Sequence, residues 1–567
     1  MKLEKTEEDL TIIIGENEEK NLVQKIPNLY DDLEDARREQ LDDIKLVRGA
    51  IYDKQVPEKG GWGEDINLPD IYELSQTLKS YLSENLYSHP EAMFDVSGVT
   101  LQSQACANKQ KSMLVNTFNN MKLENELEKV VNSVVETGES TLFVGWETKI
   151  KRIRRPQTLE EQLTMPSEDG FVIEDKVVYD NAKVKFIKPE DFVFDKNGVD
   201  NWESCAKIYR SYVDVDELST NKANNLLTAE KLETLKGVVA ENKNQDDTEK
   251  AVKKKKVEVL EYWGDIELST GEILKNRLVV IAGRHVVIRF EANPFIITPF
   301  VHANIIESPD TGRGISPLRV ALVLNNISST ILNKQIDALA LMMNPPYLAP
   351  KGCFKGEQAV KPGKIIEYDS ALMPTPPTAL SFTNALQGWE FLNYFKGTIE
   401  SATGIYNNMS GNLQASERTA TELTYSVNGQ ETRLNMMINA INRKLIVPMV
   451  EKTAEIISNF KLGNEVIAIN DNGKTVFVEI DDSVRNAEYT YRYGDRNAVI
   501  DRKNKLKELF EVIASFAKVS TLSNQINWIE CFKFALEQYG IENAENFLVA
   551  QQRVNIPPLF MQPQKFI

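Results

Sequence analysis

The feature that most constrains this fold is a helical pattern of more than forty residues in the last third of the chain. Between 418 and 460, apolar residues recur at spacings of three, four or seven, the period of one helix face. They are Ala420, Leu423, Val427, Leu434, Ile438, Ile441, Leu445, Met449, Ile456 and Phe460. Pro448 lies inside this run, where it removes one backbone hydrogen bond and crowds the preceding turn. We therefore expect one long helix with a kink at Pro448.

Two shorter helical patterns precede it, over 315–343 and 384–403. Asn344-Pro345-Pro346 ends the first, and a proline-rich stretch reaching 383 reads as short strands and extended chain. Both helices carry apolar residues on more than one face, so we expect neighbours to cover them. A polar loop with glycines and asparagines, 404–417, separates the second helix from the long one.

The N-terminal half mixes both kinds of element. Helices are predicted at 29–50, 68–88 and 110–137, and strands at 141–155, 257–266 and 276–292. Residues 177–195 read as two short strands around a turn, and 464–480 as a hairpin turning at Asn472-Gly473. Residues 237–256, which end in a lysine run, predict a charged surface loop, with a nucleic-acid patch as the alternative. A helical region over 504–554 completes an α+β chain.

Composition limits the function. The net charge of −17 argues against a protein that wraps nucleic acid tightly, because such binding needs many neutralised phosphates. Four scattered cysteines are typical of a reducing compartment. The acidic N-terminus is unlike a signal peptide, and no window of eighteen apolar residues predicts a membrane span.

No catalytic constellation is apparent. Gly473-Lys474-Thr475 resembles the end of a phosphate-binding loop, but Ala468 replaces the earlier glycine and strands flank the motif. Three dispersed histidines predict neither a metal site nor a triad. Gly312-Arg313-Gly314 is better explained as a turn leading into a helix than as a phosphate cradle. We expect no enzyme, cofactor or metal.

The order of elements resembles the portal, or head-to-tail connector, proteins of tailed double-stranded DNA phages. AKVKFIKPEDFVFD and VEVLEYWGDI are similar to wing segments of portals from short-tailed phages. GRGISPLRVALVLNNISSTILNKQIDALALMMNPPYLAPKG resembles a first stem helix entering the clip. ATGIYNNMSG and the helix that follows it resemble a tunnel loop and the kinked helix behind it. The resemblance covers roughly residues 60–510.

The resemblance implies a portal fold with an α/β wing, a two-helix stem, a small β-containing clip and a helical crown. The implied division is 1–314 N-terminal region and wing, 315–343 first stem helix, 344–383 clip, 384–403 second stem helix, 404–417 tunnel loop, 418–461 kinked helix, 462–503 wing return with a β-hairpin, and 504–567 crown and C-terminal tail.

The resemblance also implies roles for two groups of residues. The tunnel loop would face a DNA channel through Tyr406, Asn407, Asn408, Met409, Ser410, Gly411, Asn412, Leu413 and Gln414. The clip would receive the motor or adaptor near Lys351, Lys355, Lys361 and Lys364. These lysines either form basic rings in the channel or lie solvated outside the clip.

A portal protein implies a ring of about twelve subunits. Double-stranded DNA would pass through it without sequence recognition, and its protein partners would be the major capsid protein, the terminase large subunit and adaptor or tail proteins. The protein would be found at one vertex of the virion, and in the host cytoplasm during assembly. Another ring-shaped connector or adaptor is the first alternative, and a soluble enzyme is the second.

Overall fold

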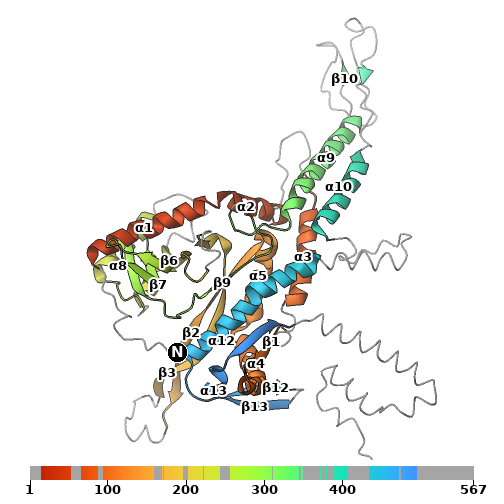
Figure 1. The fold of residues 1–567 in the computed structure, drawn as a ribbon. Coiled ribbons are helices and arrows are strands. Elements are labelled where there is room, and N and C mark those ends of the chain that lie inside the picture. Colours follow the sequence, from red (N-terminus) through yellow and green to blue (C-terminus); the bar gives the residue numbers. More distant parts are fainter. Residues whose placement is uncertain are drawn as a thin grey trace, which may run out of the picture.

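Helices and antiparallel sheets are mixed in the computed structural model of the chain (Figure 1). All strand pairs formed by its described residues are antiparallel. This confirms the predicted α+β class. The residues that the structure describes are 15–52, 66–86, 93–158, 169, 171–195, 202–220, 223–242, 256–309, 311–343, 347–348, 371, 378–379, 388–405, 433–471 and 474–494.

A five-stranded sheet in the order β4-β5-β6-β7-β8 forms one part of the body. Helix α1 covers one of its faces, with Leu22, Ile26 and Tyr30 buried against the strands. Helices α7 and α8 cover the opposite face through Val215 and Leu235. The bounds are α1 Glu16–Asp35, β4 Phe192–Phe194, β5 Lys207–Asp214, α7 Val215–Thr220, α8 Ala229–Asn242, β6 Lys256–Glu267, β7 Ile273–Ala282 and β8 Val286–Ala292.

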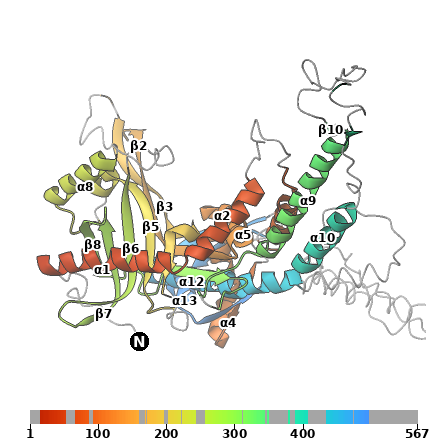
Figure 2. The ribbon, with the colours of Figure 1, turned by 90° about the horizontal axis from the view of Figure 1, so that it is seen from above.

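A second sheet, in the order β3-β2-β9, lies in the largest hydrophobic core. Helices from both ends of the chain share this core. The bounds are α2 Arg38–Tyr52, α3 Asp70–Leu86, α4 Leu101–Met121, α5 Leu123–Thr137, β2 Glu139–Pro156, β3 Phe171–Ile187, β9 Phe300–Asn304 and α12 Val447–Phe460. Because β9 pairs only with residues 139–143 of β2, the outer halves of β2 and β3 form a two-stranded ribbon that leaves the body (Figure 2).

Short elements complete the body. Strand β1 pairs with β14, and the hairpin β12–β13 packs on α4. The predicted hairpin at 464–480 is therefore present, although the turn at 472–473 lies outside the described residues. The bounds are β1 Phe94–Gly98, the 3-10 turn η3 Pro189–Asp191, β12 Glu465–Asp471, β13 Lys474–Ile480, α13 Asp482–Arg485 and β14 Tyr489–Tyr493.

Helices α9 (Arg319–Met343) and α10 (Gly388–Thr403) project from the body side by side in both views (Figures 1 and 2). We call this pair the helical arm. Strands β10 (Tyr347–Leu348) and β11 (Thr378–Ala379) pair antiparallel at its far end. The two helices fall within the predicted ranges 315–343 and 384–403, and their assignment to a stem stays a prediction.

Three sequence predictions in the N-terminal half were wrong in detail. The helix predicted over 110–137 is two helices, broken at Lys122, which adopts the left-handed conformation with φ of 55°. The helix predicted over 29–50 is divided between α1 and α2. The charged loop predicted over 237–256 is helical over 237–242, the end of α8. The two strands predicted around a turn over 177–195 are present as the end of β3 and as β4, with η3 between them, although β3 is long and begins at Phe171.

Pro448 lies in the first turn of α12, directly after a π-helical segment, η8 (Asn442–Ile446). Residues 433–441 are α-helical, so one continuous helical segment runs from 433 to 460. A π turn is wider than an α turn and is often found where the regular hydrogen-bond ladder is interrupted. The proline therefore coincides with a change of helical register, and the kink stays a prediction.

Candidate subunit interface on the helical arm

The base of the arm is set by two glycines whose backbones cross at close range. Gly138 ends α5 with φ of 77°, and a Cβ there would lie 2.1 Å from the oxygen of Ile315. A Cβ on Gly314 would lie 2.5 Å from the backbone of Gly138. Only glycine fits such an approach. The predicted turn at Gly312-Arg313-Gly314 is confirmed by the Ser308 N–H bond to the Arg313 carbonyl oxygen, and the segment that leads into α9 packs against the end of α5.

A buried ion pair fastens the same crossing. Arg313 Nη1 lies 3.3 Å from Glu139 Oε1, and both residues are at most 3% exposed. Glu139 Oε2 accepts a hydrogen bond of 2.9 Å from the Gly314 N–H. Arg313 also donates to the Phe192 carbonyl oxygen and stacks 4.0 Å from the Phe194 ring. The pair therefore joins β2, β4 and the turn before α9.

The pKa values of this pair follow from its burial. Burial alone raises the pKa of Glu139, but the charge of Arg313 and the Gly314 N–H outweigh it and lower the pKa below its usual range. Burial lowers the pKa of Arg313 to about 10, against the attraction of Glu139. Both groups are charged at neutral pH.

His302 on β9 lies beside the pair. Its Nδ1 is 2.9 Å from the Thr141 hydroxyl, and its ring stacks on Trp202 at 5.7 Å. Its Nε2 is buried and has no hydrogen-bond partner among the described residues. Burial lowers the pKa of His302 to about 4, with Glu139 opposing and Arg313 reinforcing the change. The imidazole is therefore neutral at pH 7 and packs at the base of the arm.

One face of α9 is held to the body by a row of polar side chains at helical spacing. Asn325 Nδ2 donates to Asn67 Oδ1 at 3.0 Å, and the Ser329 hydroxyl accepts from the Leu68 N–H at 3.0 Å. Asn333 exchanges two hydrogen bonds with the backbone of Ile66. These contacts fix the rotation of α9 about its axis, since each fourth residue meets the same segment.

The fixed rotation leaves an apolar stripe uncovered. Val320, Val323 and Ile327, at spacings of three and four, are 58%, 62% and 41% exposed. On α10, Phe391 and Tyr394 are also exposed. We call these five residues the arm surface. Exposed apolar residues that share one helix face, as Val320, Val323 and Ile327 do, are typical of an interaction site.

The predicted loop after α10 has a defined root. Gly404 follows the helix with φ of 75°, and its N–H bonds to the Glu400 carbonyl at 2.9 Å, a common way to end a helix. Arg433, where the next described helical residues begin, donates to the Ser401 carbonyl at 2.9 Å and would crowd any Cβ on Gly404. The two chain segments that flank 406–432 are therefore in contact.

The π-helical segment is tied to the base of the arm by Lys444. Its ammonium donates to both the backbone and the side-chain oxygen of Asn304, at the end of β9. It also lies 3.8 Å from Glu307 in the turn that leads to α9. The long helix and the arm thus share one anchoring region around β9.

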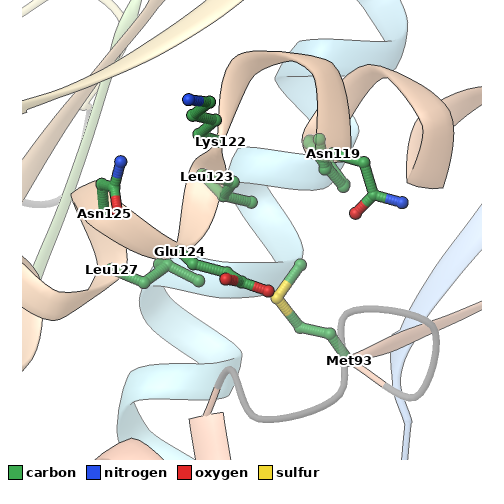
Figure 3. Close-up of a pocket in the computed structure, with 8 residues that line it drawn as sticks. Met93, Asn119, Lys122, Leu123, Glu124, Asn125 and Leu127 are labelled. Atoms are coloured by element: carbon green, nitrogen blue, oxygen red, sulfur yellow. The ribbon is translucent and has the colours of Figure 1, made fainter.

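A separate cavity of about 180 Å³ opens where α4 meets α5 (Figure 3). Met93, Phe118 and Leu127 supply apolar walls, and Lys122 and Glu124 lie on the adjoining turn. Neither a histidine, a cysteine, a serine nor a threonine is among its lining residues. Nor do the described residues contain a cluster of histidine, cysteine or carboxylate groups able to hold a metal ion.

Most site residues predicted from the sequence cannot be placed. Residues 406–414 of the loop and Lys351, Lys355, Lys361 and Lys364 lie outside the described residues. Of the named positions, only Pro448 is described. Sequence reasoning did not find Glu139, and it considered His302 only as one of three dispersed histidines. The signal that could have pointed to Glu139 is the pair of dipeptides Gly138-Glu139 and Arg313-Gly314, each joining a glycine to a charge.

Comparison with known protein families shows to which family the chain belongs. The family model of the phage SU10 portal protein matches residues 28–565. The chain belongs to this family. The resemblance to portals of short-tailed phages is thereby confirmed. None of the curated proteins compared with the chain matches it.

Portal membership makes the chain a structural component of the virion at the capsid vertex. It also implies an oligomeric ring with capsid and terminase partners, which accounts for a helical arm whose apolar surface the monomer leaves exposed. None of the portal's described helices has both the length and the apolarity needed to cross a membrane.

Proposed function

We propose that twelve copies of this portal chain close into a ring around a channel. A separate terminase motor packages double-stranded DNA through the channel, and the DNA is later ejected through it. The observation that carries the proposal is the arm surface, whose Val320, Val323 and Ile327 point away from the subunit's own core. A ring with head-to-tail contacts covers such a surface on every subunit.

The division of the chain gives each partner a place. The clip, 344–383, receives the terminase large subunit during packaging and the adaptor or tail afterwards, near its four lysines. The wing contacts the major capsid protein. Assembly takes place in the host cytoplasm, and the finished ring stays in the virion. The chain itself has no catalytic role, because the motor supplies ATP hydrolysis.

The loop at 404–417 narrows the channel, and its tip, 406–414, meets the DNA. The contact between Arg433 and the end of α10 supports this proposal, since it fixes the root from which the loop extends. Uncharged asparagine and glutamine side chains bond phosphate weakly, without the counterion release that strong binding requires. The net charge of −17 serves the same purpose, because a channel that bound DNA tightly would stall it.

We expect aspartate at Val323 and Ile327 together to prevent ring formation, because burying two carboxylates at the contact costs several kcal/mol. A ring of twelve 64.2-kDa chains has a mass of about 770 kDa, which native mass spectrometry distinguishes from the monomer. Ile273→Asp is the matched control, because Ile273 is also 62% exposed and lies on β7, away from the arm. Full rings in the double variant would exclude the arm surface from the contact.

Deletion of residues 407–412 should leave the ring intact and impair DNA packaging or retention. The reason is that the arm and body supply the subunit contacts, whereas the loop meets only DNA and neighbouring loops. The measurement is the length of nuclease-protected DNA in purified particles, with ring mass as the control. Normal packaging and retention of full-length DNA by the deletion variant would remove the loop from the channel.

A further inference from the structure

The cavity where α4 meets α5 has a buried apolar floor (Figure 3). This floor is formed by Met93, Phe118 and Leu127, which are at most 3% exposed and belong to the largest hydrophobic core. Such cores are close-packed, with few voids larger than a water molecule. An apolar cavity of about 150 Å³ holds a group as large as benzene, so the volume of about 180 Å³ here has room for a branched aliphatic side chain.

The rim of the cavity is polar and exposed. It consists of Asn119 at the end of α4, Lys122 in the turn, and Glu124 and Asn125 at the start of α5. Lys122 and Glu124 carry opposite charges, and neither has an ion-pair partner among the residues that the structure describes. In Figure 3 the Glu124 carboxylate is directed toward Met93. An occupant that enters from solvent therefore passes this charged rim before it reaches the floor.

The described part of the chain ends beside this cavity. Strand β14 pairs with β1 as far as Tyr493 opposite Phe94, and the Gly494 N–H then donates to the Met93 carbonyl oxygen at 3.2 Å. Gly494 is the last residue that the structure describes. Residues 495–567 therefore begin next to a residue of the cavity floor.

The sequence after Gly494 supplies an occupant of suitable size. Residues 495–503 read DRNAVIDRK, in which Val499 and Ile500 are the first branched aliphatic residues. An extended chain spans about 3.3–3.6 Å per residue, so the segment between Gly494 and Ile500 covers up to about 20 Å. Both aliphatic side chains can therefore reach the cavity. The next branched aliphatic residue is Leu506.

The residues that follow this aliphatic pair suit the charges of the rim. Asp501 and Arg502 come directly after Ile500 and carry one charge of each sign. With the aliphatic pair at the cavity, they lie near Lys122 and Glu124, so each rim charge has an opposite charge within the segment. Exposed ion pairs contribute little free energy. The apolar contact therefore provides most of the affinity, and the charges favour one direction of the segment.

We propose that the C-terminal segment of the same chain docks in this cavity, with Val499-Ile500 supplying the side chain that fills it. Filling the void provides the contacts that its lining otherwise lacks. The Gly494 bond to Met93 favours this occupant, because it brings the segment to the cavity within one subunit. The contact attaches residues 501–567 of the portal to the start of α5, whose other end lies at the base of the arm.

Blocking the cavity tests the docking in the full-length chain. Asn119→Trp brings a bulky apolar side chain to the rim from an exposed position, and Asn120→Trp, also exposed but not a lining residue, is the matched control. Trypsin cleavage after Arg502, followed by mass spectrometry, reports the undocked fraction, because a protease cuts the transiently open chain. Burial of one aliphatic side chain shifts an equilibrium on the order of tenfold, so the cleavage rate should rise by about this factor in Asn119→Trp. It should stay unchanged in Asn120→Trp.

A second variant removes the occupant and leaves the cavity intact. Val499→Ser combined with Ile500→Ser should raise the rate of cleavage after Arg502 by a similar factor. Adding Asn119→Trp should cause no further rise, because both changes abolish the same contact. The serine variant alters no residue of the described body, so the lining of the cavity stays as it is.

Photo-crosslinking identifies the occupant. A diazirine-bearing aliphatic amino acid, placed at positions 499 and 500 in turn, should crosslink to the lining residues of its own chain and give a product of monomer mass. Crosslinks between two chains would place the segment of a neighbouring copy in the cavity and overturn docking within one subunit. Equal cleavage rates in the unmodified chain, Asn119→Trp and the serine variant would overturn it as well. Neither readout measures the ring, so failure of the proposed ring would leave these expected results unchanged.

Discussion

Replacing Glu139 with glutamine should lower the free energy of unfolding by about 3–5 kcal/mol, the typical cost of leaving one buried charge of a pair without its partner. Arg313 would then be fully buried beside a neutral amide, with the Phe192 carbonyl as its remaining acceptor. The Gly314 N–H could still bond to the amide oxygen, so the loss is mainly electrostatic. Urea unfolding at pH 7, followed by tryptophan fluorescence, measures the change.

The control is an exposed ion pair with similar geometry. Lys45 Nζ lies 2.9 Å from Asp42, and both side chains are more than half exposed. Asp42→Asn should change stability by less than about 1 kcal/mol, because water screens such pairs. A second variant separates the loss of charge pairing from a change of side-chain shape. Glu139→Gln combined with Arg313→Met should be more stable than Glu139→Gln alone, because it leaves no unpaired buried charge at this position. If Glu139→Gln cost no more than Asp42→Asn, the buried pair would not fasten the arm.

The parts of the fold that the sequence predicted are those governed by local periodicity. Helix α9 shows this, since Pro317 and Asn344 mark its approach and its end and a continuous apolar pattern lies between them. The strand predicted over 141–155 is β2, Glu139–Pro156. Apolar side chains on several faces also predicted that the helical arm needs neighbours, although which residues remain exposed depends on the polar row that fixes its rotation.

The parts that the sequence did not predict depend on one backbone angle or on distant partners. Lys122 breaks a helical pattern because it adopts a left-handed conformation, for which lysine gives no signal. Glu139 and Arg313 are 174 residues apart, so no local pattern could pair them.

Stability should also fall as the pH drops from about 6.5 to about 4, and His302 is the cause. Its unfolded pKa is near 6.5, and burial lowers the folded pKa to about 4. Within this window the unfolded chain binds a proton that the folded chain does not, so acidification favours unfolding. The full difference amounts to about 3 kcal/mol, because each pKa unit is worth about 1.4 kcal/mol. Above pH 6.5 this contribution is constant.

The groups that face His302 explain why the folded protein does not accept the proton. Arg313 and Lys444 approach from the turn before α9 and from the π-helical segment, and among the described charged groups around it Glu139 on β2 is the one that attracts the imidazolium. The Trp202 and Phe194 rings pack on the remaining sides. Glu139 adds a second pH dependence of stability, at lower pH. Because folding lowers the pKa of Glu139, its carboxylate stabilises the fold at pH values above the pKa that this group has in the unfolded chain. This stabilisation is lost as the pH falls through the pKa of the folded state.

Unfolding free energies of the wild type and His302→Gln, measured from pH 7.5 to 4, test this assignment. Glutamine keeps a polar group near the Thr141 hydroxyl but cannot take up a proton. The slope of the unfolding free energy against pH, between pH 6.5 and about 4, should therefore fall by up to the value that one proton contributes. The variant loses the stacking on Trp202 and is expected to be less stable at pH 7.5; the slope, not the absolute value, is the decisive quantity. His285→Gln, in the turn before β8, is the comparison variant for loss of a histidine elsewhere. An unchanged slope in His302→Gln would show that other groups cause the acid sensitivity, and that the base of the arm does not depend on a neutral His302.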